Sequence, residues 1–270
     1  WRELKTADRL SPNHGMDEKC GVNRQNDINI KECSTSETPQ IVVWGDSYAM
    51  HLIQGILESR SATEIGVVQL TKSRCIPLVD ASEIDNVLPP EECIEFNDKV
   101  LNYIQNTPSI RYVLMASPYE ITENEFFDRE SKIINTKKDI YVENKMIKTA
   151  KFIESVGALP IFVAPPPSNG IDMGECLTQA LSESLPLETC NYSVSNITQN
   201  RKDTYELLRR IESKYYVADL KSVLCENGLC KVGFGDVFLY RDKGHLTTDG
   251  SKYVEAQSRI FTKIFNTKKN

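Results

Sequence analysis

The stretch Ile41–Leu52, IVVWGDSYAMHL, changes character at its fifth residue. Residues 41–44 are apolar, as expected of a buried strand, whereas Gly45-Asp46-Ser47 ends the run and leads into an amphipathic segment. This order predicts a strand that turns directly into a helix, with Ser47 at the helix N-terminus. Backbone N–H groups point outward there, and the helix dipole favours negative charge. Ser47 is therefore either a nucleophile whose attack creates an oxyanion or a serine that only caps the helix.

Similar apolar runs recur along the chain and alternate with helical patterns. We expect strands at 40–44, 64–70, 110–116, 159–164 and 215–220, and helices at 47–58, 93–106, 138–156, 199–213 and 248–265. Residues 168–198 are expected to form an irregular insertion. Strands and helices that alternate at this spacing predict an α/β fold with a mostly parallel sheet covered on both faces. In such sheets sites form at the carboxyl ends of strands, where Ser47 lies.

Length and composition narrow the class of protein. The chain of 270 residues suits one α/β domain with an appendage. We assign residues 39–270 to a catalytic domain and residues 1–38, which are polar and contain a cysteine pair, to an N-terminal extension. The formal net charge of -6 argues against a nucleic-acid partner. Since the sequence starts at Trp1 without a recognisable signal peptide, we expect it to be an excised part of something longer.

The eight cysteines predict disulfide bonds. They fall into four sets of sequence neighbours: Cys20 and Cys33, Cys75 and Cys93, Cys176 and Cys190, Cys225 and Cys230. No set has the C-x-x-C spacing of zinc or thioredoxin motifs, and the chain has only three histidines, so we expect no metal site. Disulfides indicate an oxidising compartment such as the periplasm or the cell exterior. Pairing of neighbours is a hypothesis that rests on their short separations.

A serine nucleophile needs a base, and the base needs a group that orients it. His245 lies in YRDKGHLTTDG (240–250), three residues after Asp242. In a tight turn this spacing lets the carboxylate meet the near ring nitrogen while the far nitrogen faces outward. The segment precedes the last expected helix, so His245 can reach the sheet edge where Ser47 lies. The alternative is a surface loop in which both residues are ordinary turn and capping residues.

His51 is a rival base, four residues after Ser47 on the expected helix. Residues four apart share a helix face. A histidine one turn behind the nucleophile nevertheless lies beneath it rather than over the substrate, and the local sequence places no carboxylate beside it. We therefore favour His245 as the base.

The combined motifs resemble a known superfamily. Gly-Asp-Ser at a strand-to-helix turn and Asp-x-x-His before the final helix resemble blocks I and V of the SGNH hydrolases. TKSRCIP (71–77), CENGLC (225–230) and DKGHLTTDG (242–250) resemble, more narrowly, the SGNH domains fused to acyltransferase family 3 membrane domains in O-antigen and related glycan O-acetyltransferases. An α/β-hydrolase is disfavoured, because Ala49 replaces the second glycine of its G-x-S-x-G elbow.

The resemblance implies a fold and catalytic roles. The fold is the flavodoxin-like, three-layer SGNH hydrolase fold, with about five mostly parallel strands, helices on both faces and a disulfide-pinned N-terminal extension. Ser47 is implied as the nucleophile, His245 as the base and Asp242 as its orienter. Asp46 is expected to brace the turn.

The oxyanion hole is less completely implied. Superfamily members usually add a glycine amide and an asparagine side chain to the N–H of the serine. This chain has no Gly-x-Asn after the third expected strand. We expect the Ser47 and Ser73 amides as donors, while Ser117 is either the third donor or a turn residue before proline.

The resemblance also implies a reaction and its partners. In the family, an integral membrane domain takes acetyl from cytoplasmic acetyl-CoA, and the SGNH domain passes it to sugar hydroxyls outside. We therefore expect a periplasmic O-acetyltransferase domain that belongs to an inner-membrane protein. This domain is expected to act on O-antigen polysaccharide and to bind no cofactor itself. Residues 1–38 are expected to connect it to the membrane domain. Two alternatives stay open: a secreted carbohydrate esterase or deacetylase with the same triad, and a non-catalytic glycan-binding module.

Overall fold

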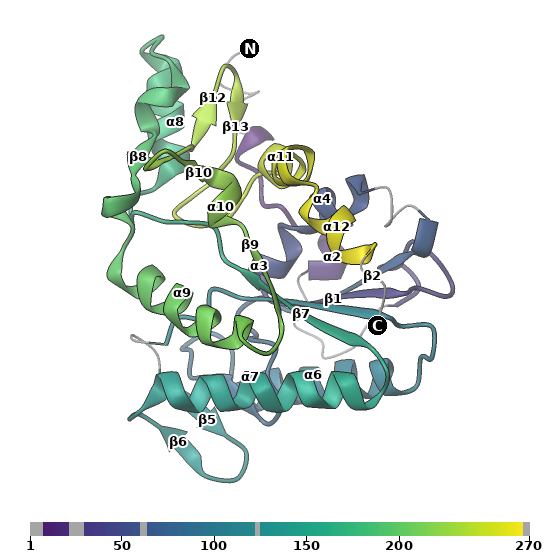
Figure 1. The fold of residues 1–270 in the computed structure, drawn as a ribbon. Coiled ribbons are helices and arrows are strands. Elements are labelled where there is room, and N and C mark those ends of the chain that lie inside the picture. The colour runs from purple at the N-terminus through teal and green to yellow at the C-terminus, as the bar shows by residue number, and fades with distance from the viewer. Residues whose placement is uncertain (1–7, 22–29, 60–63, 122–124, 267–270) are drawn as a thin grey trace.

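A five-stranded parallel sheet forms the centre of the computed structural model, which describes residues 8–21, 30–59, 64–121 and 125–266 (Figure 1). Its strands are β1 (Ile41–Gly45), β2 (Val67–Thr71), β4 (Tyr112–Ala116), β7 (Leu159–Ala164) and β9 (Tyr216–Asp219). Their order is β2-β1-β4-β7-β9, and every neighbouring pair is parallel. This is the flavodoxin-like strand order. The direction in which successive strands are added to the sheet reverses between β1 and β4. The predicted five-stranded parallel sheet is confirmed.

Helices cover both faces of the sheet and create two separate cores (Figure 1). On one face lie α6 (Pro90–Gln105), α7 (Lys138–Ser155) and α9 (Gln199–Glu212); on the other lie α3 (Ser47–Met50), α4 (Ile53–Glu58), α11 (Thr248–Ser258) and α12 (Ile260–Phe265). Successive residues of β1 pack into opposite cores. Ile41 and Val43 lie in one core, and Val42 and Trp44 lie in the other. This alternation follows from the two-residue period of a strand and explains why the whole strand is apolar.

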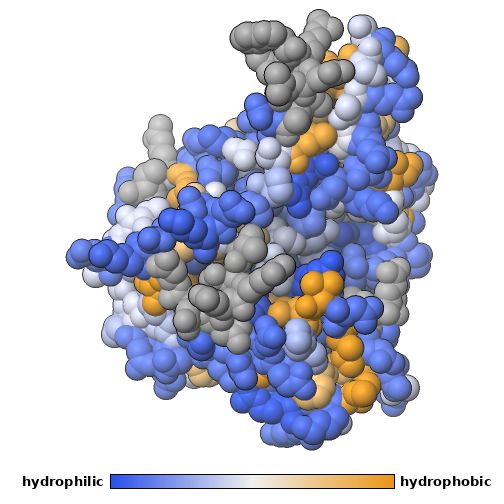
Figure 2. All heavy atoms as spheres, turned by 180° about the vertical axis from the view of Figure 1, so that it is seen from behind, coloured by the Kyte–Doolittle hydropathy of each residue, from blue (hydrophilic) through white to orange (hydrophobic). Residues whose placement is uncertain are grey.

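Shorter elements surround this three-layer centre. They are α2 (Glu18–Gly21), β3 (Ala81–Glu83), β5 (Phe126–Asp128), β6 (Lys132–Ile134), α8 (Met173–Ser182), η1 (Leu187–Cys190), β8 (Tyr192–Ser193), η2 (Val194–Asn196), α10 (Lys221–Leu224), β10 (Cys225–Glu226), β11 (Leu229–Cys230), β12 (Gly233–Phe234) and β13 (Val237–Phe238). In Figure 1, α8 and the β12–β13 hairpin rise above the sheet, whereas β5 and β6 extend below α7. Figure 2 shows a mostly hydrophilic face on which apolar residues form small groups, as on ordinary protein surfaces.

Two helices that we expected to be continuous are broken. The backbone tightens after α3, where the Leu52 N–H bonds to the carbonyl of Ala49, and α4 then begins at Ile53. The last helix breaks at Arg259, whose φ is 52°. The Glu255 carboxylate accepts the backbone N–H groups of Phe261 and Thr262 there, which replaces the helical hydrogen bonds lost at the break.

The expectation of an irregular insertion at 168–198 was wrong. The segment contains the ten-residue helix α8, whose first turn is capped by the Asp172 side chain. Met173, Leu177 and Ala180 are buried on one face of it at helical spacing. The helix was missed because this apolar stripe is short and lies between prolines and glycines.

Four disulfide bonds join the sequence neighbours, as predicted: Cys20–Cys33, Cys75–Cys93, Cys176–Cys190 and Cys225–Cys230. Each lies in a segment outside the central sheet. Each loop that they close is short, between 5 and 18 residues in sequence separation. The disulfides therefore fasten peripheral segments locally rather than joining distant parts of the fold.

Part of the described N-terminal extension lies along the outer edge of β2. Residues 33–35 pair with this strand, since the Gln69 N–H bonds to the carbonyl of Cys33 at 2.8 Å and the Thr35 N–H to that of Val67 at 2.9 Å. Residues 1–7 and 22–29 of the predicted extension lie outside the described residues, and the boundary at 38/39 stays a prediction. Within the described ranges, no helix is both long and apolar enough to cross a membrane.

The turn after β1 requires glycine. Gly45 has a φ of 148°, and a Cβ built on it would lie 2.0 Å from the carbonyl oxygen of Ala116 at the end of β4. Both the backbone angle and the close approach exclude a side chain. Gly45 therefore lets the chain leave β1 tightly against β4.

We predict that Gly45→Ala lowers the free energy of unfolding by about 3 kcal/mol, because it adds backbone strain and a clash with a backbone atom. Gly157→Ala is the matched control: Gly157 has a φ of 89°, but nothing lies within 4 Å of its Cβ position. Strain alone should cost this variant about 1 kcal/mol. Denaturant unfolding of both variants measures the difference, and equal losses would contradict the proposed close approach.

Candidate active site

Ser47 is the first residue of α3, directly after β1. Because the strand order reverses between β1 and β4, it lies at the point where open α/β sheets form their sites. The helix cap is not Ser47 but Asp46, whose Oδ1 accepts the Tyr48 N–H at 2.8 Å. The Ser47 hydroxyl therefore does not cap this helix, and its role as a nucleophile stays a prediction.

Ser47, His245 and Asp242 form one chain of hydrogen bonds. Ser47 Oγ lies 2.8 Å from His245 Nε2, and His245 Nδ1 lies 2.9 Å from Asp242 Oδ2. A carboxylate can only accept, so Nδ1 carries the proton and Nε2 is left to accept the hydroxyl proton of Ser47. The three side chains that the sequence singled out are therefore brought together in the order that general-base activation of serine requires.

The loop that carries His245 is folded around the Asp242 carboxylate. Asp242 Oδ1 accepts the backbone N–H groups of Gly244 at 3.0 Å and His245 at 2.8 Å. Burial acts to raise the pKa of Asp242, but the hydrogen bonds from the His245 ring and from these two N–H groups outweigh it and hold the pKa well below its usual range. Asp242 is therefore ionised at any pH near neutrality, and it fixes both the loop and the ring.

Asp46 and Ser117 brace the site from beneath. The hydroxyl of Ser117, at the end of β4, donates to Asp46 Oδ2 at 2.6 Å, and both side chains are buried. Burial raises the pKa of Asp46 to about 6, against the opposing effects of the Ser117 and Tyr48 hydrogen bonds. The Ser117 proton is therefore engaged by Asp46, and the oxyanion role of Ser117 stays a prediction.

Ser73 is exposed in the turn that follows β2. The preceding residue, Lys72, donates its N–H to the carbonyl of Gly45 at 3.0 Å, which holds this turn beside the end of β1. The Ser47 and Ser73 amides as oxyanion donors stay predictions.

His51, the rival base, lies beside Tyr48 and His245. It is buried, and its ring centre is 5.3 Å from that of Tyr48 and 5.9 Å from that of His245. Its Nδ1 accepts the Leu246 N–H at 3.3 Å, whereas Nε2 is buried with no hydrogen-bond partner. Burial and the neighbouring His245 hold the pKa of His51 well below its usual value, so the ring is neutral. His51 therefore supports the loop after His245 through this hydrogen bond.

Sequence reasoning missed Arg201 in α9, whose side chain is only 4% exposed and reaches the Tyr48 hydroxyl. A signal was present. Arg201 is in phase with the buried residues Thr204, Leu208 and Ile211, so the helical period alone places a cation on the buried face.

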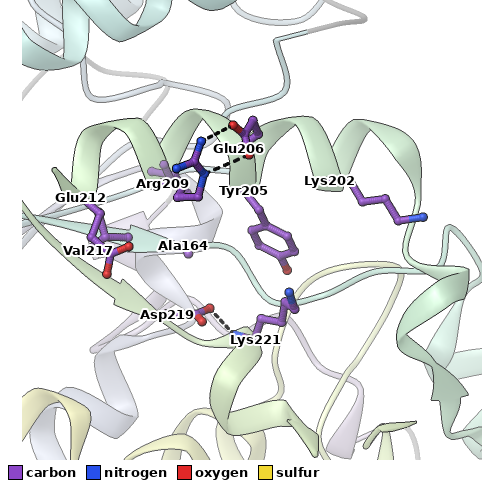
Figure 3. A pocket seen from close by; sticks show the side chains of 10 residues that line it. Ala164, Lys202, Tyr205, Glu206, Arg209, Glu212, Val217, Asp219 and Lys221 are labelled. Carbon is purple, nitrogen blue, oxygen red and sulfur yellow. Dashed lines mark hydrogen bonds and ion pairs between the residues drawn. The ribbon is translucent and has the colours of Figure 1, made fainter. Parts of the chain in front are cut away.

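A cleft of about 400 Å³ lies elsewhere, between α9 and β9 at the sheet edge (Figure 3). Among its lining residues, Arg209 pairs with Glu206, and the Lys221 ammonium lies over the Tyr205 ring. Ser47, Asp242 and His245 do not line it. Across the described part of the chain, no group of three or more His, Cys, Asp or Glu side chains could hold a metal ion.

A comparison with protein families gives a match over most of the chain. The family described as "SGNH domain (fused to AT3 domains)" matches residues 19–259. The chain belongs to this family. A comparison with curated protein sequences gave no match.

Two solved structures show the same fold. The periplasmic domain of a lipopolysaccharide acetyltransferase from Salmonella ser. Paratyphi A has a TM-score of 0.67 at 19% identity, over 98% of this chain and 96% of that one. A putative SGNH hydrolase from Slackia heliotrinireducens has a TM-score of 0.50 at 10% identity, over 84% of this chain and 98% of that one. At these identities the likeness establishes the SGNH hydrolase fold. It is a fold of acyl-transfer and hydrolytic enzymes.

The buried His51 predicts a pH dependence of stability. Below about pH 6.5, His51 takes up a proton in the unfolded chain but stays neutral in the folded chain. Each further unit by which the pH falls therefore lowers the free energy of unfolding by about 1.4 kcal/mol. His51→Gln removes this group, and its stability should fall less steeply between pH 6.5 and 5. The raised pKa of Asp46 makes stability change with pH in the opposite direction. Asp46 is present in both the wild-type protein and the His51→Gln variant, so its effect cancels in the comparison. Denaturant unfolding at several pH values measures the two slopes, and identical slopes would refute the prediction.

Proposed function

We propose that this domain transfers an acetyl group, through Ser47, to hydroxyl groups of a cell-surface polysaccharide such as O-antigen. The observation that carries the proposal is the hydrogen-bonded chain Ser47–His245–Asp242 at the strand-order reversal of a domain whose family is fused to AT3 domains. The similarity of this fold to that of a lipopolysaccharide acetyltransferase domain supports acetyl as the group transferred.

In the first step, His245 Nε2 removes the hydroxyl proton as Ser47 Oγ attacks the carbonyl carbon of the acetyl donor. The tetrahedral intermediate collapses, the imidazolium returns the proton to the leaving group, and acetyl-Ser47 remains. Asp242 stays ionised and stabilises the imidazolium without taking its proton. The Ser47 and Ser73 amides are the proposed oxyanion donors, and each such donor typically contributes about a hundredfold to a thousandfold in rate.

In the second step, a sugar hydroxyl takes the place of the leaving group. His245 removes its proton as the sugar oxygen attacks the acetyl carbon, the bond to Ser47 Oγ breaks, and the proton passes to Ser47. The sugar leaves as its acetate ester, and the enzyme returns to its starting state.

The family supports a setting for this reaction. An AT3 membrane domain is the proposed source of acetyl, with acetyl-CoA as the ultimate donor, and the polysaccharide is the acceptor. The four disulfides support an oxidising compartment, and the likeness to a periplasmic domain supports the periplasm. We propose that the domain itself binds no cofactor.

Hydrolysis is the second candidate, since the same triad can pass the acetyl group to water. His245 is 21% exposed, so solvent reaches the ring that would activate the water. A pure binding module is disfavoured, because binding alone does not require a serine, a histidine and a carboxylate in one hydrogen-bonded chain.

We predict that a small activated ester such as 4-nitrophenyl acetate adds one acetyl group to Ser47, detected by intact-protein mass spectrometry and peptide mapping. Ser47→Ala should remove the label, and His245→Ala should slow labelling at least a thousandfold. Ser73→Ala is the control, because it keeps the amide that we assign to the oxyanion hole and should label at the normal rate. Labelling of Ser47→Ala at the normal rate would overturn the proposal.

The acceptor is tested on the labelled protein. If the transferase proposal holds, O-antigen oligosaccharides shorten the lifetime of acetyl-Ser47 and appear as acetate esters. If the label decays to acetate at one rate with or without glycan, water is the acceptor and the hydrolase alternative replaces the transferase.

A further inference from the structure

Arg201 is a buried cation that the proposed reaction does not use. Its side chain is 4% exposed, and the ion pair that it makes within the described residues is with Glu120 Oε1, 3.9 Å away on a side chain that is 35% exposed. Burying a charge is unfavourable unless hydrogen bonds and opposite charge compensate for it. This long ion pair with a partly exposed partner is weak compensation, so the neutral contacts of Arg201 are the next to consider.

Those contacts lead to the active site. Arg201 Nη2 donates to the Tyr48 hydroxyl at 3.4 Å, and Nη1 donates to the carbonyl of Pro118 at 3.3 Å. The guanidinium carbon also lies 5.6 Å from the centre of the Tyr48 ring, within range of a cation–π interaction. Pro118 belongs to the loop that leaves β4. Arg201 therefore fastens Tyr48 to the loop beside the nucleophile.

Tyr48 in turn packs against the base. It directly follows Ser47, and its ring centre lies 4.6 Å from that of His245 with a tilt of 43°. Its hydroxyl end lies against Gly244, where a built Cβ would be only 2.2 Å from the oxygen. The ring thus fills the space behind the segment Asp242–His245, and the absence of a side chain at position 244 lets it approach.

His51 lies beside both rings, with its ring centre 5.3 Å from that of Tyr48 and 5.9 Å from that of His245. His51 is held in turn by the hydrogen bond from Leu246, the residue after His245. The Tyr48 ring thus contacts both histidine rings, while its hydroxyl end is held by Arg201.

We propose that Arg201 and Tyr48 are positioning residues for His245: the guanidinium fixes the tyrosine ring, and the ring holds the imidazole at hydrogen-bond distance from Ser47. The proposal rests on the proposed function, because it gives His245 the role of base. Misplacement of a reacting group by about 1 Å can reduce a rate about a hundredfold, so packing behind the imidazole is sufficient to matter.

The test uses three variants of the whole domain and the rate of Ser47 acetylation by 4-nitrophenyl acetate. Tyr48→Phe keeps the ring but removes the oxygen that Arg201 holds. Arg201→Met removes the charge and both hydrogen bonds, and Arg201→Lys restores the charge alone. Arg209→Met is the matched control, because Arg209 lies on the same helix but is exposed and pairs with Glu206 at the surface.

We expect the maximal rate of acetylation to fall about tenfold in Tyr48→Phe and Arg201→Met, with the half-saturating ester concentration unchanged, and to recover partly in Arg201→Lys. Arg209→Met should acetylate normally. The double variant Tyr48→Phe/Arg201→Met should be no slower than the slower single variant, because both changes act through one contact. A purely structural role would lower the folded fraction without this pattern, and thermal unfolding of each variant measures that fraction.

Normal acetylation rates in folded Tyr48→Phe and Arg201→Met would overturn the inference while the proposed function stands. Additive losses in the double variant would also overturn it, since Arg201 would then not act through Tyr48. Full acetylation of Ser47→Ala would instead remove the proposed function, and this inference with it.

Discussion

The site depends on how the chain leaves β1. Gly45 passes so close to the carbonyl of Ala116 that no side chain fits, and Asp46 then ties this turn to β4 through Ser117 while it caps α3. Because Asp46 takes over both tasks, the next hydroxyl along the chain has no structural duty. Ser47 is thereby available to His245 at a point where the two neighbouring strands β2 and β4 carry their connections away in opposite directions.

Much of the architecture could be predicted from the sequence because the central strands are buried on both faces. Such strands are continuous apolar runs, so β1, β4 and β7 stand out with nearly correct ends. The neighbouring pairs of cysteines were also predictable, since short separations favour local closure. The position of Ser47, Asp242 and His245 in one chain of hydrogen bonds agrees with the three-residue spacing and with the resemblance to SGNH hydrolases.

What the sequence did not reveal depends on contacts between distant segments. The local sequences of 47–58 and 248–265 do not predict a break in either helix. The second break is stabilised by the Glu255 carboxylate, which accepts the backbone N–H of Phe261. Capping by Asp46 rather than by Ser47 is likewise a choice between adjacent residues with similar preferences. Arg201 was missed for a different reason. The helical period of the sequence places it on the buried face of its helix, but its partner Tyr48 is 153 residues away.

Gly244 and Tyr48 carry a consequence for how this sequence can vary. The hydroxyl of one fills the volume that a side chain on the other would need. The two positions are therefore not free to drift independently: a chain that acquires alanine at 244 must first shorten or move the ring at 48, and a chain that loses the ring gains room for a larger residue at 244. Among relatives, the residues that correspond to Tyr48 and Gly244 should be inherited together.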